Sequence, residues 1–270
     1  MLVWVAIKKK LATCSNEIMS TILVQQQQIF YTAGPAGAGP HLLLVHGAGG
    51  SHRDWPEQLR QRPNVLAIDL PGHHLSALPG RTTVNDYATF VIDFIHQLGL
   101  QQVVVAGHSM GGAIAQTIGL LRPEAVMGLI MVGSGARLRV HEAILGQILS
   151  NLAGAVDFIT ANEWAPDTPS ELKRSGREQL LANDPTVMYH DYTACNQFDL
   201  ITQLDQIRLP TLVISGTADR MTPLKYGQFL ADHIPKAKFA IIEGGGHKMA
   251  LEQPESITHT ILEELRVMSS

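Results

Sequence analysis

Three residues with the side chains of a hydrolytic triad occur in this chain in the order Ser109, Asp219 and His247. A serine hydroxyl is a weak nucleophile at neutral pH. It therefore needs a histidine that accepts its proton and a carboxylate that orients the histidine. Ser109 occupies the centre of a Gly-x-Ser-x-Gly pattern at residues 107–111. Together, these residue types predict acyl transfer through a covalent intermediate on Ser109.

The residues around Ser109 have the pattern of a tight turn between a strand and a helix. Residues 103–106 are Val-Val-Val-Ala, which is typical of a buried strand, and residues 112–116 have a helical pattern. In such a turn the strand and the helix nearly touch, so small residues must flank the serine. The flanking glycines are Gly107, Gly111 and Gly112. We therefore identify Ser109 as the candidate nucleophile.

The candidate acid and the candidate base each follow a strand-like run. Asp219 ends a short loop after an apolar run, and His247 ends a glycine-rich loop after the next one. Both side chains are then expected at the same edge of a sheet as Ser109. Asp219 can instead cap the helix that follows it, and His247 can be an ordinary loop histidine. The alternative acids are Asp199 and Asp205.

A tetrahedral intermediate also needs N–H groups that stabilise its oxyanion. The backbone N–H of Met110, directly after the nucleophile, is the first candidate donor. The loop at residues 46–50 has the sequence His-Gly-Ala-Gly-Gly, and we assign the second donor to the N–H of Ala48. A glycine-rich loop can instead bind phosphate, but the chain has neither a G-x-G-x-x-G pattern nor a P-loop lysine.

Short apolar runs alternate with longer helical patterns along most of the chain. Unbroken apolar runs are typical of strands buried on both faces of a parallel sheet. These runs are residues 42–45, 65–68, 103–106, 129–132, 211–214 and 239–242. The helical patterns are residues 83–98, 109–121, 223–233 and 254–267. The alternation predicts an α/β protein with a doubly wound, mostly parallel sheet, preceded by one or two strands within residues 21–31.

The alternation stops between residues 136 and 209, where a helical pattern with three prolines replaces the strands. We expect a helical cap at residues 136–204, inserted after the sixth strand. The core then consists of residues 21–135 and 205–270. Residues 1–20 are expected to form a disordered N-terminal extension.

The expected cap offers apolar and charged side chains to a substrate pocket. The candidate pocket residues are Trp164, Met188 and Tyr192. The arginines available to bind a carboxylate are Arg137, Arg139, Arg174 and Arg177. Asp191, in the same segment, is interpreted as a surface or packing residue.

The composition restricts the partners and the compartment. The chain has 270 residues, a formal net charge of −4 and 45% hydrophobic residues, so it offers no basic field for nucleic acid. Its two cysteines form neither a CxxC pair nor a disulfide framework, and we expect a cytoplasmic protein. Residues 1–7 are apolar but precede three lysines, unlike a secretory signal. We expect a small-molecule ester as substrate, no metal, no cofactor, no membrane span, and a monomer or homodimer.

These motifs resemble those of the α/β-hydrolase superfamily over residues 42–267. The matching residues are His46, Gly47, residues 69–73, residues 107–112, Asp219 and His247. His74 stands where relatives have the second glycine of Asp-x-Pro-Gly-x-Gly. The resemblance implies this fold and a hydrolase activity. The serine nucleophile separates the chain from haloalkane dehalogenases and epoxide hydrolases, which use aspartate at this position.

The resemblance leaves several reactions open, because one fold supports many activities. We expect a serine carboxylesterase that acts on small to medium acyl chains. The alternatives are hydroxynitrile lyases, C–C bond hydrolases and perhydrolases with the same triad, and receptor-like members with little turnover. Lys248 after His247 resembles a pair in plant hydroxynitrile lyases, although those enzymes carry threonine where this chain has Gly47. Lys248 can equally be a solvated surface charge.

Overall fold

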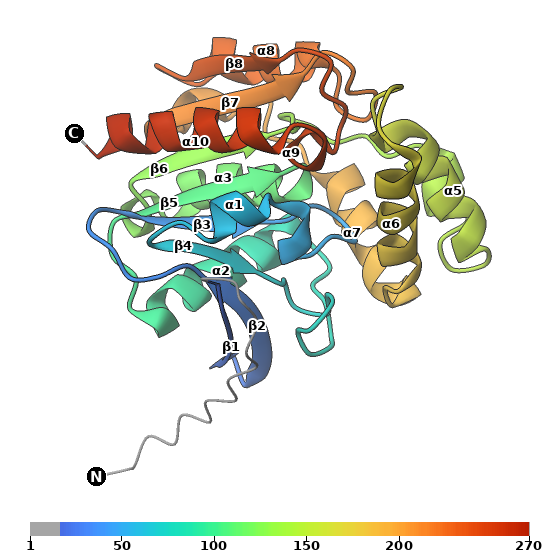
Figure 1. The fold of residues 1–270 in the computed structure, drawn as a ribbon, viewed down its shortest axis with the longest axis horizontal. Helices are drawn as coiled ribbons and strands as arrows, with labels where there is room; N and C mark the ends of the chain where they lie inside the picture. The colour runs from blue at the N-terminus through green and yellow to red at the C-terminus, as the bar shows by residue number, and fades with distance from the viewer. Residues whose placement is uncertain (1–16, 270) are drawn as a thin grey trace.

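The computed structural model describes residues 17–269, which form one eight-stranded sheet in the order β1-β2-β4-β3-β5-β6-β7-β8 (Figure 1). β2 pairs antiparallel with β1 and β4, and all other pairs are parallel. The strands are β1 (Ile18–Val24), β2 (Gln27–Ala33), β3 (His41–Val45), β4 (Val65–Ile68), β5 (Val103–His108), β6 (Gly128–Val132), β7 (Thr211–Gly216) and β8 (Lys238–Ile242). This sheet confirms the predicted fold class.

Helices cover both faces of the sheet. The helices are α1 (Glu57–Arg60), α2 (Val84–Leu98), α3 (Met110–Leu121), α4 (Glu142–Leu145), α5 (Leu152–Glu163), α6 (Ser170–Leu181), α7 (Pro185–Gln197), α8 (Leu224–His233), α9 (Met249–Glu252) and α10 (Pro254–Met268). In β5, Val103 and Val105 pack in the cluster that includes α2, α3 and α8. Val104 and Ala106 pack in the cluster on the other face, with α1 and α10. Two buried faces explain the unbroken apolar strands.

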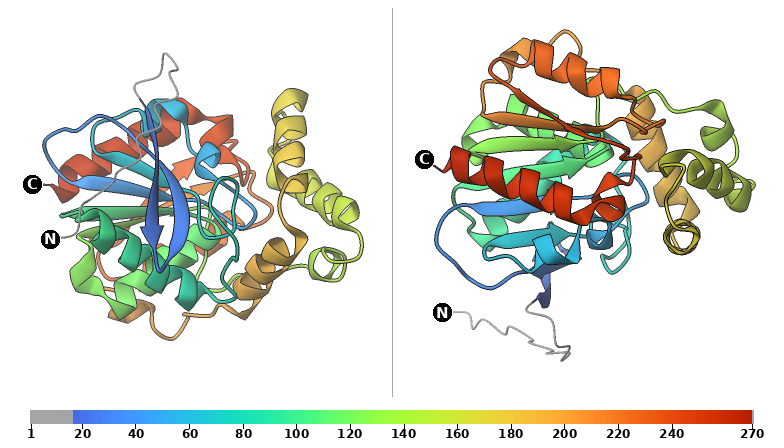
Figure 2. Two further views of the ribbon diagram at one scale, coloured as in Figure 1. Left: turned by 90° about the horizontal axis from the view of Figure 1, so that it is seen from below. Right: turned by 45° about the horizontal axis from the view of Figure 1, so that its top comes forward.

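Helices α4 to α7 gather at one end of the sheet, where α5 and α6 project beyond the main body (Figures 1 and 2), while Ala194 and Cys195 of α7 pack into the main core. They connect β6 to β7, as predicted for an insertion after the sixth strand. Their apolar side chains form a cluster of their own, which contains Ile148, Val156 and Leu180. We call residues 136–204 the insertion.

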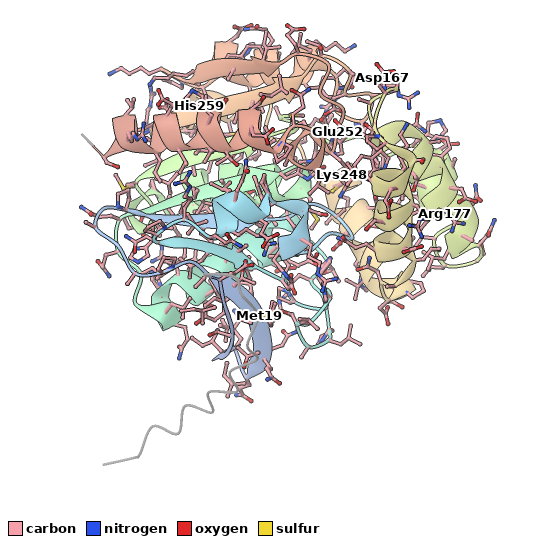
Figure 3. All side chains as sticks on the ribbon, viewed as in Figure 1. Met19, Asp167, Arg177, Lys248, Glu252 and His259 are labelled. Carbon is pink, nitrogen blue, oxygen red and sulfur yellow. The ribbon has the colours of Figure 1, made fainter. Side chains whose placement is uncertain are left out.

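The sheet begins earlier in the sequence than predicted. β1 starts at Ile18 and pairs with β2, so residues 18–20 belong to the core and not to an N-terminal extension. The predicted disorder of residues 1–16 lies outside the described residues. Ile18 and Met19 are exposed at this edge strand (Met19 is labelled in Figure 3), so the strand lacks the buried apolar run of the central strands β3 to β7. Within residues 17–269, no helix is long and apolar enough to cross a bilayer.

Candidate active site

The turn between β5 and α3 holds Ser109 in a strained conformation. Its φ of 53° and ψ of −113° lie in a region that residues other than glycine rarely adopt. A Cβ atom at Gly107 would collide with the Gly111 carbonyl group, and one at Gly111 would collide with the Val45 carbonyl group. Glycine is therefore required at both positions. The resulting close approach leaves Ser109 partly exposed at the end of β5.

The structure brings Asp219 and His247 together. His247 Nδ1 lies 2.9 Å from Asp219 Oδ2, and both side chains are buried. Thr222 Oγ1 donates to the same carboxylate oxygen over 2.7 Å. The N–H groups of Met221 and Thr222 each donate to Asp219 Oδ1 over 2.8 Å. Asp219 therefore caps the turn before α8 and contacts His247, so its two interpretations are compatible.

The surroundings of Asp219 favour its charged form. Burial raises the pKa of this carboxyl group, but the interaction with His247 and the hydrogen bonds from His247 and Thr222 outweigh burial. The net pKa therefore lies below its usual value. An ionised carboxylate only accepts hydrogen bonds, so the hydrogen in this contact resides on His247 Nδ1. His247 Nε2 is then able to accept a proton.

The two alternative acids lie elsewhere. Asp199 accepts a hydrogen bond from Arg137 Nε over 2.7 Å at the surface. Asp205 is exposed in the connection that leads to β7. Of the three carboxylates that the sequence offered, Asp219 is the one that contacts His247.

A cavity of about 380 Å³ lies between the end of the sheet and the insertion. Ser109, His247 and Ala48 line it from the core, and Tyr192 lines it from α7. The candidate nucleophile and base therefore face a common space. A small organic molecule fits a cavity of this size.

Trp164 and Met188 do not line this cavity, contrary to the sequence prediction. The Trp164 ring packs against Gly176 of α6, and Met188 packs within the apolar cluster of the insertion. Both side chains are almost completely buried. Their apolar surface stabilises the insertion and is not available to a ligand.

Charged side chains also border the cavity. Arg139 lines it, whereas the other three arginines that the sequence offered pair with carboxylates at the surface. These surface pairs are Arg137 with Asp199, Arg174 with Glu171 and Glu178, and Arg177 with Asp157 (Arg177 is labelled in Figure 3). Arg220, which follows Asp219, is a further lining residue that the sequence prediction missed.

Lys248 is buried and lines the cavity, so it is not a solvated surface charge. Its Nζ donates to Asp54 Oδ2 over 3.2 Å and lies 4.0 Å from Glu163 Oε2. Asp54 lies 194 residues away along the chain. No local pattern in the sequence indicates this pairing, because the fold alone brings the two residues together.

The 46–50 loop follows β3 and lies beside the candidate nucleophile. A Cβ atom at Gly47 would be 3.2 Å from the Ser109 Cβ atom. Within residues 17–269, the N–H groups of Ala48 and Met110 donate to no protein acceptor. The Met110 N–H also lies at the positive end of the α3 dipole. Both groups are therefore available to an anion near Ser109.

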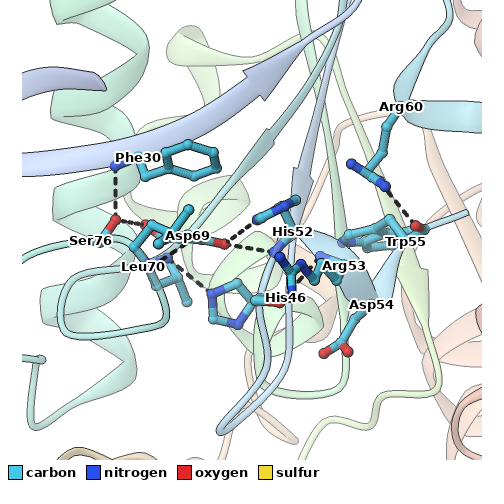
Figure 4. Close-up of polar contacts among 12 residues, drawn as sticks. Phe30, His46, His52, Arg53, Asp54, Trp55, Arg60, Asp69, Leu70 and Ser76 are labelled. Carbon is cyan, nitrogen blue, oxygen red and sulfur yellow. Dashed lines mark hydrogen bonds and ion pairs between the residues drawn. The ribbon is translucent and has the colours of Figure 1, made fainter. Parts of the chain in front are cut away.

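Two buried histidines beside the site are held neutral. His46 Nε2 accepts from the Leu70 N–H over 2.9 Å, and its Nδ1 donates to the Gly47 carbonyl oxygen over 2.8 Å (Figure 4). Burial is the main cause that lowers the pKa of His46 to about 4. His108 Nε2 lies 2.8 Å from the His247 carbonyl oxygen, and burial lowers the pKa of His108 to about 3. His108 is therefore a packing residue beside the nucleophile.

The chain is similar to known hydrolases over most of its length. The model of a family described as "Alpha/beta hydrolase family" matches residues 42–258. A thermophilic esterase of known structure superimposes with a TM-score of 0.84 and 30% sequence identity, covering 93% of this chain and 98% of the esterase.

Two curated proteins of Acinetobacter baylyi extend this similarity. The (E)-2-((N-methylformamido)methylene)succinate hydrolase is 28% identical and covers 83% of this chain and 90% of its own length. The 3-oxoadipate enol-lactonase 1 is 27% identical and covers 82% of this chain and 86% of its own length. The names of these proteins describe hydrolytic enzymes with different substrates.

Proposed function

The chain belongs to the alpha/beta hydrolase family, and on that basis we propose that it is a serine hydrolase for carboxylic esters with small to medium acyl groups. One observation carries the proposal: His247 contacts Asp219 over 2.9 Å at the wall of a cavity that Ser109 also lines. This combination of nucleophile, base and carboxylate suits acyl transfer.

In the proposed reaction, Ser109 Oγ attacks the carbonyl carbon of the ester while His247 Nε2 accepts the serine proton. Asp219 holds the imidazole with its hydrogen on Nδ1 and stabilises the imidazolium. His247 then donates the proton to the leaving alcohol as the acyl-enzyme forms. In the second half, His247 takes a proton from water, whose oxygen attacks the acyl carbon. The bond from the acyl carbon to Ser109 Oγ then breaks, His247 returns the proton to Ser109 Oγ, and the acid is released.

The proposed oxyanion hole consists of the N–H groups of Ala48 and Met110. Both N–H groups lack a protein acceptor within the described chain. Met110 directly follows Ser109, and Ala48 lines the same cavity as Ser109. Fixed donors that face the developing negative charge lower the barrier because they need no reorganisation during the reaction.

We propose that the insertion acts as a cap that sets the substrate size. Its aliphatic and phenylalanine lining residues are Leu138, Val140, Ile144, Phe158 and Ile159. A cavity of about 380 Å³ is at the small end of the range for ligand pockets. Arg139 adds a cationic group to this wall, which suits an ester that carries a second, free carboxylate.

The test is hydrolysis of p-nitrophenyl esters from acetate to long acyl chains by the wild type and Ser109→Ala. We expect turnover that is highest for short to medium chains and falls by several orders of magnitude in the variant. A folded wild-type protein that hydrolyses none of these esters, or a Ser109→Ala variant with unchanged turnover, would exclude the proposal.

A second candidate function is cyanohydrin cleavage, and the position of Lys248 favours it. This lysine is buried at the cavity wall directly after His247, where an ammonium group is able to stabilise a leaving cyanide. However, Asp54 and Glu163 already surround its charge. Release of cyanide from mandelonitrile, measured beside ester hydrolysis, distinguishes the two functions.

A further inference from the structure

The insertion holds the 46–50 loop through both polar groups of one glycine. The Gly49 N–H donates to Asp191 Oδ2 over 3.0 Å, and the Gly49 carbonyl oxygen accepts from Asn183 Nδ2 over 2.9 Å. These partners lie 142 and 134 residues away along the chain, in α7 and just before it. The sequence prediction of a surface or packing role for Asp191 missed these contacts.

Asp191 is fully buried and accepts two further hydrogen bonds from the core. His73 Nε2 donates to its Oδ2 over 2.7 Å, and the Tyr87 hydroxyl donates to its Oδ1 over 2.7 Å. The other ring nitrogen of His73 lies 3.0 Å from the Pro71 carbonyl oxygen, which only accepts. The Pro71 contact therefore places a hydrogen on Nδ1, and the contact with Asp191 favours a second hydrogen on Nε2, so the charged form of His73 is stabilised.

The His73 charge compensates Asp191 inside the protein. Burial lowers the pKa of His73, but the Asp191 carboxylate outweighs burial, and the net pKa is raised. A buried carboxylate beside a cation is a strong hydrogen-bond acceptor. Its position is fixed, because moving either charge away from the other leaves both buried without a partner. Gly49 is thus bound to a rigid group and not to a mobile surface side chain.

These contacts fix the two peptide planes on either side of Ala48. On one side, the Gly47 carbonyl oxygen accepts from the Gly50 N–H over 3.1 Å and from His46 Nδ1 over 2.8 Å. On the other side, Asp191 holds the Gly49 N–H, which lies in the plane that shares the Ala48 Cα atom with the first plane. Asn183 holds the Gly49 carbonyl oxygen, which lies in one plane with the Gly50 N–H that donates to the Gly47 carbonyl oxygen. The Ala48 N–H belongs to the same plane as the Gly47 carbonyl group, so Asp191 and Asn183 both restrain its direction.

We propose that Asp191 and Asn183 are positioning residues, which direct the Ala48 N–H towards the oxyanion that forms at Ser109. The inference rests on the proposed function, since it names the residues that hold one donor of the proposed oxyanion hole in place. Oxyanion donors act over about 2.7–3.1 Å, so rotation of the Ala48 peptide weakens them. The insertion then contributes to transition-state stabilisation as well as to the substrate pocket.

A purely structural role for these contacts predicts a different result. If Asp191 and Asn183 only hold the insertion against the core, their loss lowers the free energy of unfolding or raises KM, as any substitution that loosens the insertion does. If they direct an oxyanion donor, their loss lowers kcat with little change in KM, because the oxyanion exists only after attack on the ester.

The test compares Asn183→Ala and Asp191→Ala with the wild type and with Val156→Ala. Val156 is buried in the insertion and does not line the cavity, so Val156→Ala destabilises the insertion without removing a hydrogen bond to the 46–50 loop. Hydrogen exchange of residues 46–51 is followed by mass spectrometry, and kcat and KM are measured on the best p-nitrophenyl ester. Asn183 is only partly buried, so its variant remains informative if Asp191→Ala does not fold.

We expect faster exchange of the loop and a kcat lower by roughly 10- to 100-fold in Asn183→Ala, with KM unchanged, against about 10²–10³ for complete loss of a donor. Val156→Ala is expected to show neither effect. Unchanged loop exchange, or a kcat like that of Val156→Ala, would overturn the inference. If the wild type hydrolyses no ester, the proposed function fails, and the exchange measurement still decides whether these residues position the loop.

Discussion

Lys248 Nζ lies 3.2 Å from Asp54 Oδ2 in the interior of the protein. In the sequence, Lys248 directly follows the candidate base His247. Lys248, Asp54 and Glu163 are 8%, 4% and 3% exposed, so little water screens their charges. Burial lowers the pKa of Lys248, but the Asp54 and Glu163 carboxylates outweigh burial, and the net pKa is raised. The wall of the cavity therefore contains a lysine that stays charged at neutral pH.

Lys248→Met is expected to destabilise the protein strongly. It leaves the Asp54 carboxylate buried without its cation, and breaking a buried pair in this way costs about 3–5 kcal/mol. The free energy of unfolding, measured by urea denaturation at pH 7, tests this value. Lys238→Met is the matched control, because the Lys238 side chain is half exposed in its pair with Glu264.

The control is expected to change stability by no more than about 1 kcal/mol. Equal losses for the Lys248 and Lys238 variants would mean that Asp54 reaches solvent or protonates once Lys248 is gone. The structure would then overstate the role of this pair in stability.

Gly111→Ala is expected to disrupt the turn that carries Ser109. The new Cβ atom would collide with the Val45 carbonyl group and would lie 2.7 Å from the His46 carbonyl oxygen, so β3 and α3 must separate. Overpacking of this kind costs about 1–3 kcal/mol or more. Separation also displaces the 46–50 loop, so we expect ester hydrolysis to fall with stability.

Gly99→Ala is the control for this substitution. A Cβ atom there meets nothing within 4 Å, but φ is +64°, so only the backbone conformation is strained. That strain costs about 1–2 kcal/mol. Full ester hydrolysis by a folded Gly111→Ala variant would show that the turn tolerates a wider spacing.

The sequence predicts the triad candidates because each follows an apolar run that forms a strand of the sheet. Parallel strands end at a common edge, so Ser109, Asp219 and His247 are expected at one place before any contact is known. The structure adds the contact between Asp219 and His247 and the cavity that His247 shares with Ser109.

The sequence does not predict residues whose roles depend on distant partners. Lys248 and Asp191 are charged residues with no local pattern around them, yet both are buried because carboxylate or imidazolium partners from other elements compensate them. Trp164 and Met188 show the opposite error. Their apolar side chains suit a ligand pocket, but they pack against other residues of the insertion and do not reach the cavity.

The stability of the protein is expected to fall between pH 6.5 and pH 4. The pKa values of His46 and His108 are lowered from 6.5 to about 4 and about 3. In this window the unfolded chain binds protons at these histidines and the folded protein does not. The free energy of unfolding therefore falls as the pH falls, by about 1.4 kcal/mol per pH unit for each of these two histidines. The lowered pKa of His74 adds to this loss, and the raised pKa of Glu163 opposes it.

Urea denaturation of the wild type and His108→Gln at pH 7, 6 and 5 measures this slope. Since His108→Gln removes one of the two groups, it is expected to halve the slope due to these histidines. His73 does not contribute in this window, because its pKa is raised and its stabilisation is lost only as the pH rises through the raised value. Identical slopes in both proteins would show that His108 is not a proton-linked group.

Under the proposed function, Arg139→Gln is expected to weaken the binding of anionic esters. Arg139 lines the cavity, and a hydrogen bond to a charged group contributes about 1.5–3 kcal/mol, so loss of the guanidinium group is expected to raise KM by 10-fold or more. The substrates are monoethyl succinate, which carries a free carboxylate, and ethyl butyrate, which does not. KM for ethyl butyrate is expected to stay unchanged.

Arg137→Gln is the control, because it removes the same charge from a residue that pairs with Asp199 outside the cavity. If both variants raise KM for monoethyl succinate equally, the effect comes from net charge, and Arg139 does not bind the substrate carboxylate.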